Sequence, residues 1–522
     1  MKKIFIFMFL LITFTYGNSE NIIGYNIEYY PENYDPQLNT DALSGDILSY
    51  AFEGLTRLDA KGNPIPAVAE SWSNTGDIWT FKLRKTAKWH NGDTVVAKDF
   101  VDAWERFLNP NVNSDYSYIM YCIKGAQEYN EGTYKDFSLV GIKAIDSFTF
   151  QVTLKEPVIY FPSLASFYSF YPQNTKFLKT LKNSKYGSSY ADILGNGAFE
   201  IHKLKKISEL SLIKSDKYWN KSNIKIDVIN LSTFHEDDIF RKFETKKIDI
   251  SELNSENFSE YKNFKNIQTY EDGSIWYLTL NTDNYLFSNK KIRKALSMAI
   301  DRKFLVNNVK SNLGSIAESF IPNVIKGNSD FYRNEYNQYI YDISYNPQKA
   351  KKYFEDGLVE LGLNKSEIGT ICLLVGNNNT AVADGDFLIE QFKKNLDLDV
   401  ILEPVTFEIR CQRKSSKDYD IIFGGWAPDY NDPMAYLEMW TTNSSENYEI
   451  WHNQDYDEII ELAKKERDFK KRIDLLAGAE RVLINESPIV PLYFRKKAFL
   501  INPNIGKVNF NLFYPKVNFI YD

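Results

Sequence analysis

Apolar and polar residues alternate over several short stretches in the first third of the chain. Residues 79–83, which read Trp-Thr-Phe-Lys-Leu, follow a period of two that is typical of a half-buried strand. A helical pattern starts at Lys98, and its apolar face consists of Phe100, Val101, Trp104, Phe107 and Leu108. The period of two returns at Phe148, Phe150, Val152 and Leu154. Residues 45–188 are therefore predicted to form a mixed α/β unit.

Strands and helices alternate more regularly between Thr370 and Gly425. The predicted order is strand (371–375), helix (387–395), strand (400–405), short helix and strand (421–425). This alternation favours a mostly parallel, doubly wound sheet. Ligands of such sheets bind outside the carboxyl ends of the strands. The segment that follows Gly425 is therefore the first place to look for a binding site.

That segment combines two glycines, a tryptophan and an aspartate. Gly424 and Gly425 allow another main chain to approach closely, because no Cβ stands in the way. Trp426 supplies a flat apolar wall and Asp429 supplies a fixed negative charge. The combination suits a ligand with a positive charge and a peptide-like edge. A turn acid that bonds to its own backbone is an equal alternative for Asp429, and the sequence alone leaves the choice open.

Composition, net charge and a predicted export signal narrow the class of protein. The chain has 522 residues, enough for two or three domains, with 43% hydrophobic and 25% charged residues, as in an ordinary globular protein. Its net charge of −7 and the lack of a long basic run argue against a nucleic-acid partner. Lys2 and Lys3 precede an apolar run that ends at Phe14, which predicts a signal peptide over residues 1–17. With no cysteine near that site for a lipid anchor, we expect a protein exported to the periplasm.

Catalytic and metal-binding signatures are missing from the sequence. The four histidines form no His-Glu-x-x-His motif, and no Cys-x-x-Cys, Gly-x-Ser-x-Gly or phosphate-binding glycine loop is found. The acidic run that follows His235 fits a helix start better than a metal site. We therefore expect no cofactor, no metal and no enzyme activity.

Three cysteines are too few for a disulfide framework. Cys122, Cys372 and Cys411 are expected to be small buried hydrophobes, with a single Cys372–Cys411 bridge as the open alternative. Trp79, Trp89 and Trp104 are expected in the core because of their periodic spacing.

Almost the whole mature chain resembles the large extracytoplasmic solute-binding proteins, family 5, of oligopeptide ABC transporters. The resemblance rests on residues 53–59 (Glu-Gly-Leu-Thr-Arg-Leu-Asp), 66–72 (Pro-Ala-Val-Ala-Glu-Ser-Trp), 79–93, 97–106 and 293–302. It implies an α/β, periplasmic-binding-protein-like fold of type II in its large three-domain form, with mixed β-sheets and a ligand cleft between two lobes. The implied domains are I (18–44, 189–280 and 494–522), II (45–188) and III (281–493).

Residues 425–433 resemble the oligopeptide and murein-peptide branch of this family. The resemblance implies that Asp429 receives the ligand's α-ammonium group, next to Gly425, Trp426 and Ala427. It further implies a lining tyrosine at Tyr116, a strand-like segment that pairs with the ligand at Tyr30, Pro31 and Glu32, and aromatic pockets at Tyr277 and Phe407. A basic residue that clamps the C-terminus of short peptides in some members falls on Phe423 here, and a second falls at or near Lys414.

The function that the resemblance implies is the periplasmic substrate-binding component of an ABC transporter. Such a monomer would capture oligopeptides and deliver them to membrane permease subunits. Alternative cargo of the same fold is a murein peptide, a glutathione-like molecule or another non-standard ligand. A secreted hydrolase is the more distant alternative.

Overall fold

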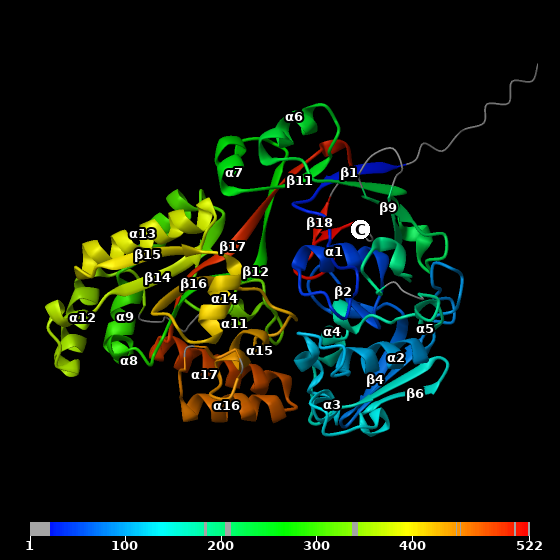
Figure 1. Ribbon diagram of the computed structural model, residues 1–522, viewed down its shortest axis with the longest axis horizontal. Coiled ribbons are helices and arrows are strands. Elements are labelled where there is room, and N and C mark those ends of the chain that lie inside the picture. Colours follow the sequence, from blue (N-terminus) through cyan, green and yellow to red (C-terminus); the bar gives the residue numbers. More distant parts are fainter. Residues whose placement is uncertain are drawn as a thin grey trace, which may run out of the picture.

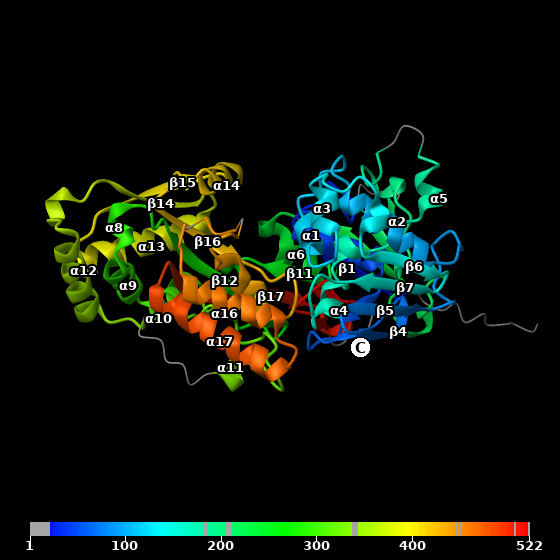
Figure 2. The ribbon, with the colours of Figure 1, turned by 90° about the horizontal axis from the view of Figure 1, so that it is seen from below.

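The computed structural model describes residues 21–181, 185–203, 210–336, 343–444, 446–448, 450–505 and 508–519. The predicted signal peptide at residues 1–17 lies outside the described residues. Two lobes lie side by side (Figures 1 and 2), joined by the long strands β12 (Ile267–Leu280) and β17 (Ile489–Ile501). We call lobe one the part that carries β1 to β11, and lobe two the part that carries α8 to α17.

An 11-stranded sheet runs through both lobes. Its order is β15 (Val400–Val405), β14 (Ile371–Gly376), β16 (Ile421–Trp426), β12, β17, β11 (Ile250–Leu253), β1 (Ile22–Asn26), β10 (Val228–Ser232), β9 (Leu210–Lys214) and β8 (Phe199–Lys203), and β13 (Gly314–Ile316) pairs with β17. Strand β14 is parallel to β15 and β16, as the alternation predicts. Outside this region the pairing changes, because β12 is antiparallel to β16 and to β17. The sheet is mixed, in agreement with the expected fold class.

A smaller antiparallel sheet forms the outer part of lobe one. Its strands are β4 (Ala69–Thr75), β5 (Ile78–Leu83), β7 (Thr149–Thr153) and β6 (Ile142–Asp146). The amphipathic helix α2 (Ala97–Leu108) buries its apolar face on this sheet, and the ring of Trp104 meets Phe150 edge to face with centroids 4.9 Å apart. Trp79, Trp89 and Trp104 are all buried, so their expected core positions are confirmed.

Short helices connect the strands of lobe one, and longer helices cover the sheet of lobe two. Lobe one also contains α1 (Ala42–Ala51), α3 (Ala126–Asn130), α4 (Phe161–Leu164), α5 (Thr175–Leu178), α6 (Ile239–Glu244), α7 (Ser255–Tyr261) and the small pairs β2 (Thr56–Leu58) with β3 (Pro64–Pro66) and β18 (Asn509–Phe510) with β19 (Val517–Asn518). Lobe two contains α8 (Tyr285–Ser288), α9 (Lys290–Met298), α10 (Arg302–Phe304), α11 (Tyr332–Glu335), α12 (Pro347–Leu361), α13 (Asn379–Leu396), α14 (Phe407–Ser415), α15 (Met434–Leu437), α16 (Gln454–Lys465) and α17 (Phe469–Glu486). Within the described residues, no helix combines the length and the apolar character that crossing a bilayer requires.

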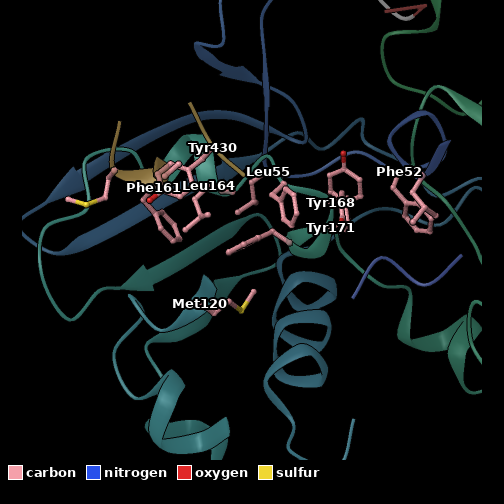
Figure 3. Close-up of a cluster of buried hydrophobic side chains, with 14 of the residues drawn as sticks. Phe52, Leu55, Met120, Phe161, Leu164, Tyr168, Tyr171 and Tyr430 are labelled. Carbon is pink, nitrogen blue, oxygen red and sulfur yellow. The ribbon is translucent and has the colours of Figure 1, made fainter. Parts of the chain in front are cut away.

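The apolar core of lobe one accepts a residue from lobe two. Tyr430 lies with Phe161, Leu164 and Leu55 in one buried cluster (Figure 3), and only 6% of Tyr430 is exposed. The next residue, Asn431, donates from its side-chain amide to the main-chain oxygens of Lys61 and Gly62 at 3.3 Å. The two lobes are therefore in contact directly behind the predicted ligand segment.

The cysteines form no disulfide in the described structure. Cys122, Cys372 and Cys411 are all free thiols, so the Cys372–Cys411 alternative is not realised. Cys411 is exposed on the helix α14, and Cys122 and Cys372 are only partly buried, which corrects the expectation that all three are buried. For Cys411 the reason is that α14 has no buried residue.

Candidate ligand-binding site

The end of β16 offers an unpaired main-chain edge. On one side β16 pairs with β12 over its whole length, with Tyr277 opposite Gly424 and Trp276 opposite Gly425. On the other side the pairing with β14 stops at Ile422. Residues 424–426 therefore have a strand partner on one side only, and Gly425 is exposed. Such an edge accepts an extended chain as an added strand.

Trp426 and Ala427 complete this edge. The Trp426 side chain is half-buried against the core, and its Nε1 donates to the main-chain oxygen of Ala435 at 2.9 Å, which fixes the orientation of the ring. Ala427 is exposed. A rigid wall beside an open backbone is the arrangement that the sequence predicts here.

Asp429 is a half-buried carboxylate without a partner. Among the described residues, no hydrogen-bond donor and no cation contacts it, so the alternative of a turn acid bonded to its own backbone is not realised. Burial, followed by the nearby carboxylates Glu438 and Glu446, raises the pKa of Asp429 to about 7. The Asp429 carboxylate therefore has no counter-ion among the described residues, and a bound cation would lower its pKa again.

Tyrosines of lobe one lie near Asp429. Tyr116 and Tyr118 stack with centroids 6.1 Å apart, and Tyr116 meets Phe167 edge to face at 5.8 Å. Burial raises the pKa of both hydroxyls, and the charge of Asp429 is the second cause in each case, so both side chains lie near this carboxylate. The expected role of Tyr116 in lining the ligand site stays a prediction.

The segment from Tyr30 to Asn33 forms no strand in the described structure. Tyr30 donates its hydroxyl to the main-chain oxygen of Leu231 at 3.2 Å, Pro31 is buried, and Glu32 lies exposed at a bend. No strand of the described chain pairs with this segment, so its expected pairing with a ligand stays a prediction.

Two adjoining cavities line the space between the lobes. The first, about 390 Å³, is bounded by the end of β11 in lobe one and by Phe407, Arg410 and Phe423 in lobe two. The second, about 630 Å³, lies in lobe one, beside Tyr29, Asp46 and Lys516. They share Glu252, Leu253, Asn254, Arg495 and Lys497, so they form one polar groove, which we call the cleft.

Tyr514 is a buried tyrosine near Asp429. Burial raises the pKa of its hydroxyl, and the further causes include Tyr116, Asp46 and Asp429. In that cavity, burial raises the pKa of Asp46 to about 6 and lowers that of Lys516 to about 8. The cleft is thus lined by groups of both signs.

The remaining predicted site residues divide between cleft and core. Phe407 is 69% exposed and lines the first cavity, so the structure places it in the cleft. Tyr277 is only 3% exposed and packs edge to face against Phe320 and Trp440, because strand alternation turns it toward the core. Lys414 places its Nζ 4.5 Å from the ring centre of Tyr448 and does not line either cavity. Arg410, which the sequence analysis did not single out, lines the first cavity.

No metal site is found in the described part of the chain, where no group of three or more histidine, cysteine or acidic side chains is arranged to hold an ion. His235 instead accepts a hydrogen bond from the main-chain nitrogen of Asp237 at 3.5 Å and begins a short helical turn, as predicted.

Comparison with known proteins gives the family of the chain. The model of the bacterial extracellular solute-binding proteins, family 5, matches residues 63–448. The chain belongs to this family. It is 31% identical over 503 residues to the oligopeptide-binding protein OppA of Bacillus subtilis (strain 168), covering 94% of this chain and 91% of that protein. The relatives are binding proteins that act outside the cytoplasmic membrane.

Solved structures of family members share the fold of this solute-binding protein. The substrate-binding domain of an oligopeptide ABC transporter from Bacillus anthracis str. Ames is 33% identical with a TM-score of 0.80, covering 96% of this chain and 98% of that one. OppA of Listeria monocytogenes bound to peptide is 32% identical with a TM-score of 0.79, covering the same shares. The two-lobed mixed α/β fold is therefore confirmed.

Proposed function

We propose that this chain is the periplasmic substrate-binding component of an ABC transporter and that it captures oligopeptides for a membrane permease. The observation that carries the proposal is the partnerless carboxylate of Asp429 beside the one-sided edge of residues 424–426. A peptide carries both complements, an α-ammonium group and a main chain that pairs as a strand. The names of the relatives, which include an oligopeptide-binding protein and a peptide-bound structure, support the same conclusion.

Main-chain pairing makes the binding tolerant of sequence. Each hydrogen bond to the ligand backbone is independent of the ligand's side chains, which are left to roomy, polar cavities that hold water. The charged bond to Asp429 adds about 1.5–3 kcal/mol and fixes which end of the peptide enters. No bond of the ligand is made or broken, so the chain acts as a receptor and not as an enzyme.

The proposal includes closure of the two lobes on the ligand. Asp429 belongs to lobe two and Tyr116 to lobe one, so a peptide that contacts both favours the closed arrangement over an open one. The closed monomer would then be the form that the permease recognises. We retain the division into domains I, II and III and the signal peptide over residues 1–17 as parts of this proposal.

The cargo itself gives the direct test. Protein purified under native conditions and then denatured should release peptides that mass spectrometry identifies, and a panel of free peptides should raise the melting temperature of the emptied protein. Release of murein peptides or glutathione-like molecules would assign the alternative cargo of the same fold. If neither released material nor any peptide in the panel stabilises the protein, the proposed function is wrong.

A further inference from the structure

A tight turn of lobe one, residues 59–63 between β2 and β3, reaches across to lobe two. Two of its main-chain oxygens, those of Lys61 and Gly62, accept hydrogen bonds from the side-chain amide of Asn431 at 3.3 Å. Asn431 is only 5% exposed, and its side-chain oxygen accepts a hydrogen bond from the main-chain nitrogen of Lys326 at 3.0 Å. The Asn431 amide is therefore bonded on both sides, to lobe one through its nitrogen and to lobe two through its oxygen.

Lys326 makes a second connection between lobe two and the same turn. Its Nζ donates to the side-chain oxygen of Asn63 at 2.8 Å. Gly62 lies so close to the Asn431 amide that a larger residue does not fit, since a Cβ built on it would lie 1.9 Å from Nδ2 of Asn431. The φ angle of Gly62 is +75°, in the left-handed region that favours glycine. The 59–63 turn and Asn431 are thus fitted to one another at contact distance.

The chain after Asp429 is held at each of its next three residues. Tyr430 stacks on a tyrosine of lobe one, Asn431 bonds the 59–63 turn, and Asp432 pairs with an arginine of lobe two. Two of these three attachments therefore reach lobe one. Among the described residues, neither Asn431 nor the turn lines the two cavities. The position of the Asp429 carboxylate thus depends on groups that lie outside the cleft.

We propose that the 59–63 turn of lobe one positions Asp429 through Asn431, so that contact between the lobes completes the anchor for the ligand's ammonium group. This inference rests on the proposed function and gives lobe one a role that requires no contact with the ligand. A single residue separates Asp429 from Asn431, so a displacement of Asn431 passes directly to the carboxylate. Asn431 and Lys326 are positioning residues, and recognition of the ammonium group is coupled to the contact between the lobes.

The variant Gly62→Ala breaks this contact without changing a group that lines the two cavities. Its methyl group would collide with the Asn431 amide and displace the turn from lobe two. Gly92→Ala is the matched control, because Gly92 also lies in a turn of lobe one, has a φ of +92° and would place its Cβ where no atom lies within 4 Å. Both variants carry backbone strain, and only Gly62→Ala also loses the contact with lobe two.

Calorimetry with alanine peptides of three to five residues, each free and N-acetylated, measures how well the anchor is positioned. In the wild type and in Gly92→Ala, the free form should bind about a hundredfold more tightly than the acetylated form. In Gly62→Ala this ratio should fall to about tenfold or less, because the carboxylate is no longer held where the ammonium group arrives. A purely structural role of the turn would lower the affinity for both forms and leave the ratio unchanged.

Variants of lobe two test the same connection from its other side. Asn431→Ala and Lys326→Met should each lower the ratio, and Lys326→Arg should retain most of it, because an arginine still donates to the Asn63 side chain. The double variant Gly62→Ala with Asn431→Ala should lose no more than Asn431→Ala alone. The reason is that the methyl group of Gly62→Ala collides with the amide that Asn431→Ala removes.

Hydrogen exchange follows the segment without a ligand. The amides of residues 425–433 should exchange faster in Gly62→Ala than in Gly92→Ala. Equal exchange in these two variants, or an equal ratio of free to acetylated binding, would overturn the inference. Should Gly62→Ala fail to fold, Lys326→Met against Lys326→Arg provides the same test, and equal ratios in that pair would overturn it too.

The wild type separates a failure of this inference from a failure of the proposed function. If the wild type binds no peptide, or binds free and acetylated peptides alike, the anchor on which the proposed function rests is refuted. If the wild type prefers the free peptide and Gly62→Ala keeps that preference in full, only the positioning role of the 59–63 turn is refuted.

Discussion

The rings of Tyr160 and Tyr430 stack face to face, with centroids 4.7 Å apart and planes within 2° of parallel. Tyr160 precedes α4 in lobe one, and Tyr430 directly follows Asp429 in lobe two. The guanidinium carbon of Arg472 lies 5.0 Å from the ring centre of Tyr160, and the Tyr430 hydroxyl donates to Glu438 at 3.2 Å. The ligand anchor and the contact between the lobes are therefore neighbours in one short segment.

Replacing Tyr430 by alanine should open the molecule and weaken peptide binding. Loss of the aromatic pair removes about 0.5–1.5 kcal/mol beyond the buried area and frees Asp429 from its fixed position. Small-angle X-ray scattering should show a larger radius of gyration for the ligand-free variant, and calorimetry should show affinity reduced about threefold or more. Tyr345→Ala, at an exposed tyrosine of lobe two, should change neither quantity. Equal compactness of both variants would show that this contact does not control closure.

Removing Arg472 should destabilise the protein strongly. Its two terminal nitrogens pair with the two carboxylate oxygens of Asp432 at 2.7 and 2.8 Å, and both side chains are 2% exposed. Arg472→Met leaves the buried Asp432 carboxylate without its cation, at a cost of about 3–5 kcal/mol. Urea unfolding followed by circular dichroism should show a much lower midpoint.

The control for Arg472 is an exposed pair on the same helix. Lys470 contacts Asp474 at 2.8 Å, with both side chains largely in solvent. Lys470→Met should leave the unfolding midpoint almost unchanged, because exposed ion pairs contribute little to stability. If the two variants lose the same small amount of stability, the buried pair does not hold the segment after Asp429 in place.

Peptide affinity should depend on pH through Asp429. In the free protein its pKa is about 7, and an ammonium group favours the charged form and lowers that pKa. Below pH 7 Asp429 is mostly protonated in the free protein, so binding must release its proton. As the pH is lowered below 7, the affinity should therefore fall by up to about tenfold per pH unit. Above about pH 8 the peptide's own α-amino group loses its proton, so the affinity should fall again.

Calorimetry between pH 5.5 and 9 in buffers of different ionisation enthalpy checks this dependence. Proton release below pH 7 should vanish in Asp429→Asn, together with the acid limb of the profile. A wild-type affinity that stays level from pH 5.5 to 7 would mean that Asp429 does not pair with the ligand's charge.

Much of the fold follows from patterns in the sequence. The face of α2 and the order of strand and helix from β14 to β16 were predictable, because burial on one side imposes the helical and strand periods. The strand β17 was not predicted, since Arg495, Lys496 and Lys497 interrupt its apolar pattern where it faces the cleft. The direction of β12 was also missed, because strand periodicity carries no information about pairing partners.

The candidate site was predictable in part. The segment from Gly425 to Asp429 combines a glycine, a tryptophan and an aspartate, which together suit a ligand with a main-chain edge and a positive charge. Phe407 was predicted from the family resemblance. Tyr277 illustrates the limit: Trp276 and Tyr277 look alike in the sequence, and only the register of β12 against β16 turns Trp276 to the first cavity and Tyr277 to the core. Arg410 could have been found from its spacing of three residues after Phe407, which places both on one helix face.

The most direct measurement is calorimetry of one free peptide and its N-acetylated form with the wild type and with Asp429→Asn. Asp429→Asn keeps the shape of the side chain and removes its charge. The account predicts that only the free peptide binds the wild type tightly, and that acetylation and the substitution each weaken binding by about a hundredfold or more, without adding to one another. Equal binding of the free and acetylated peptides by the wild type would contradict it.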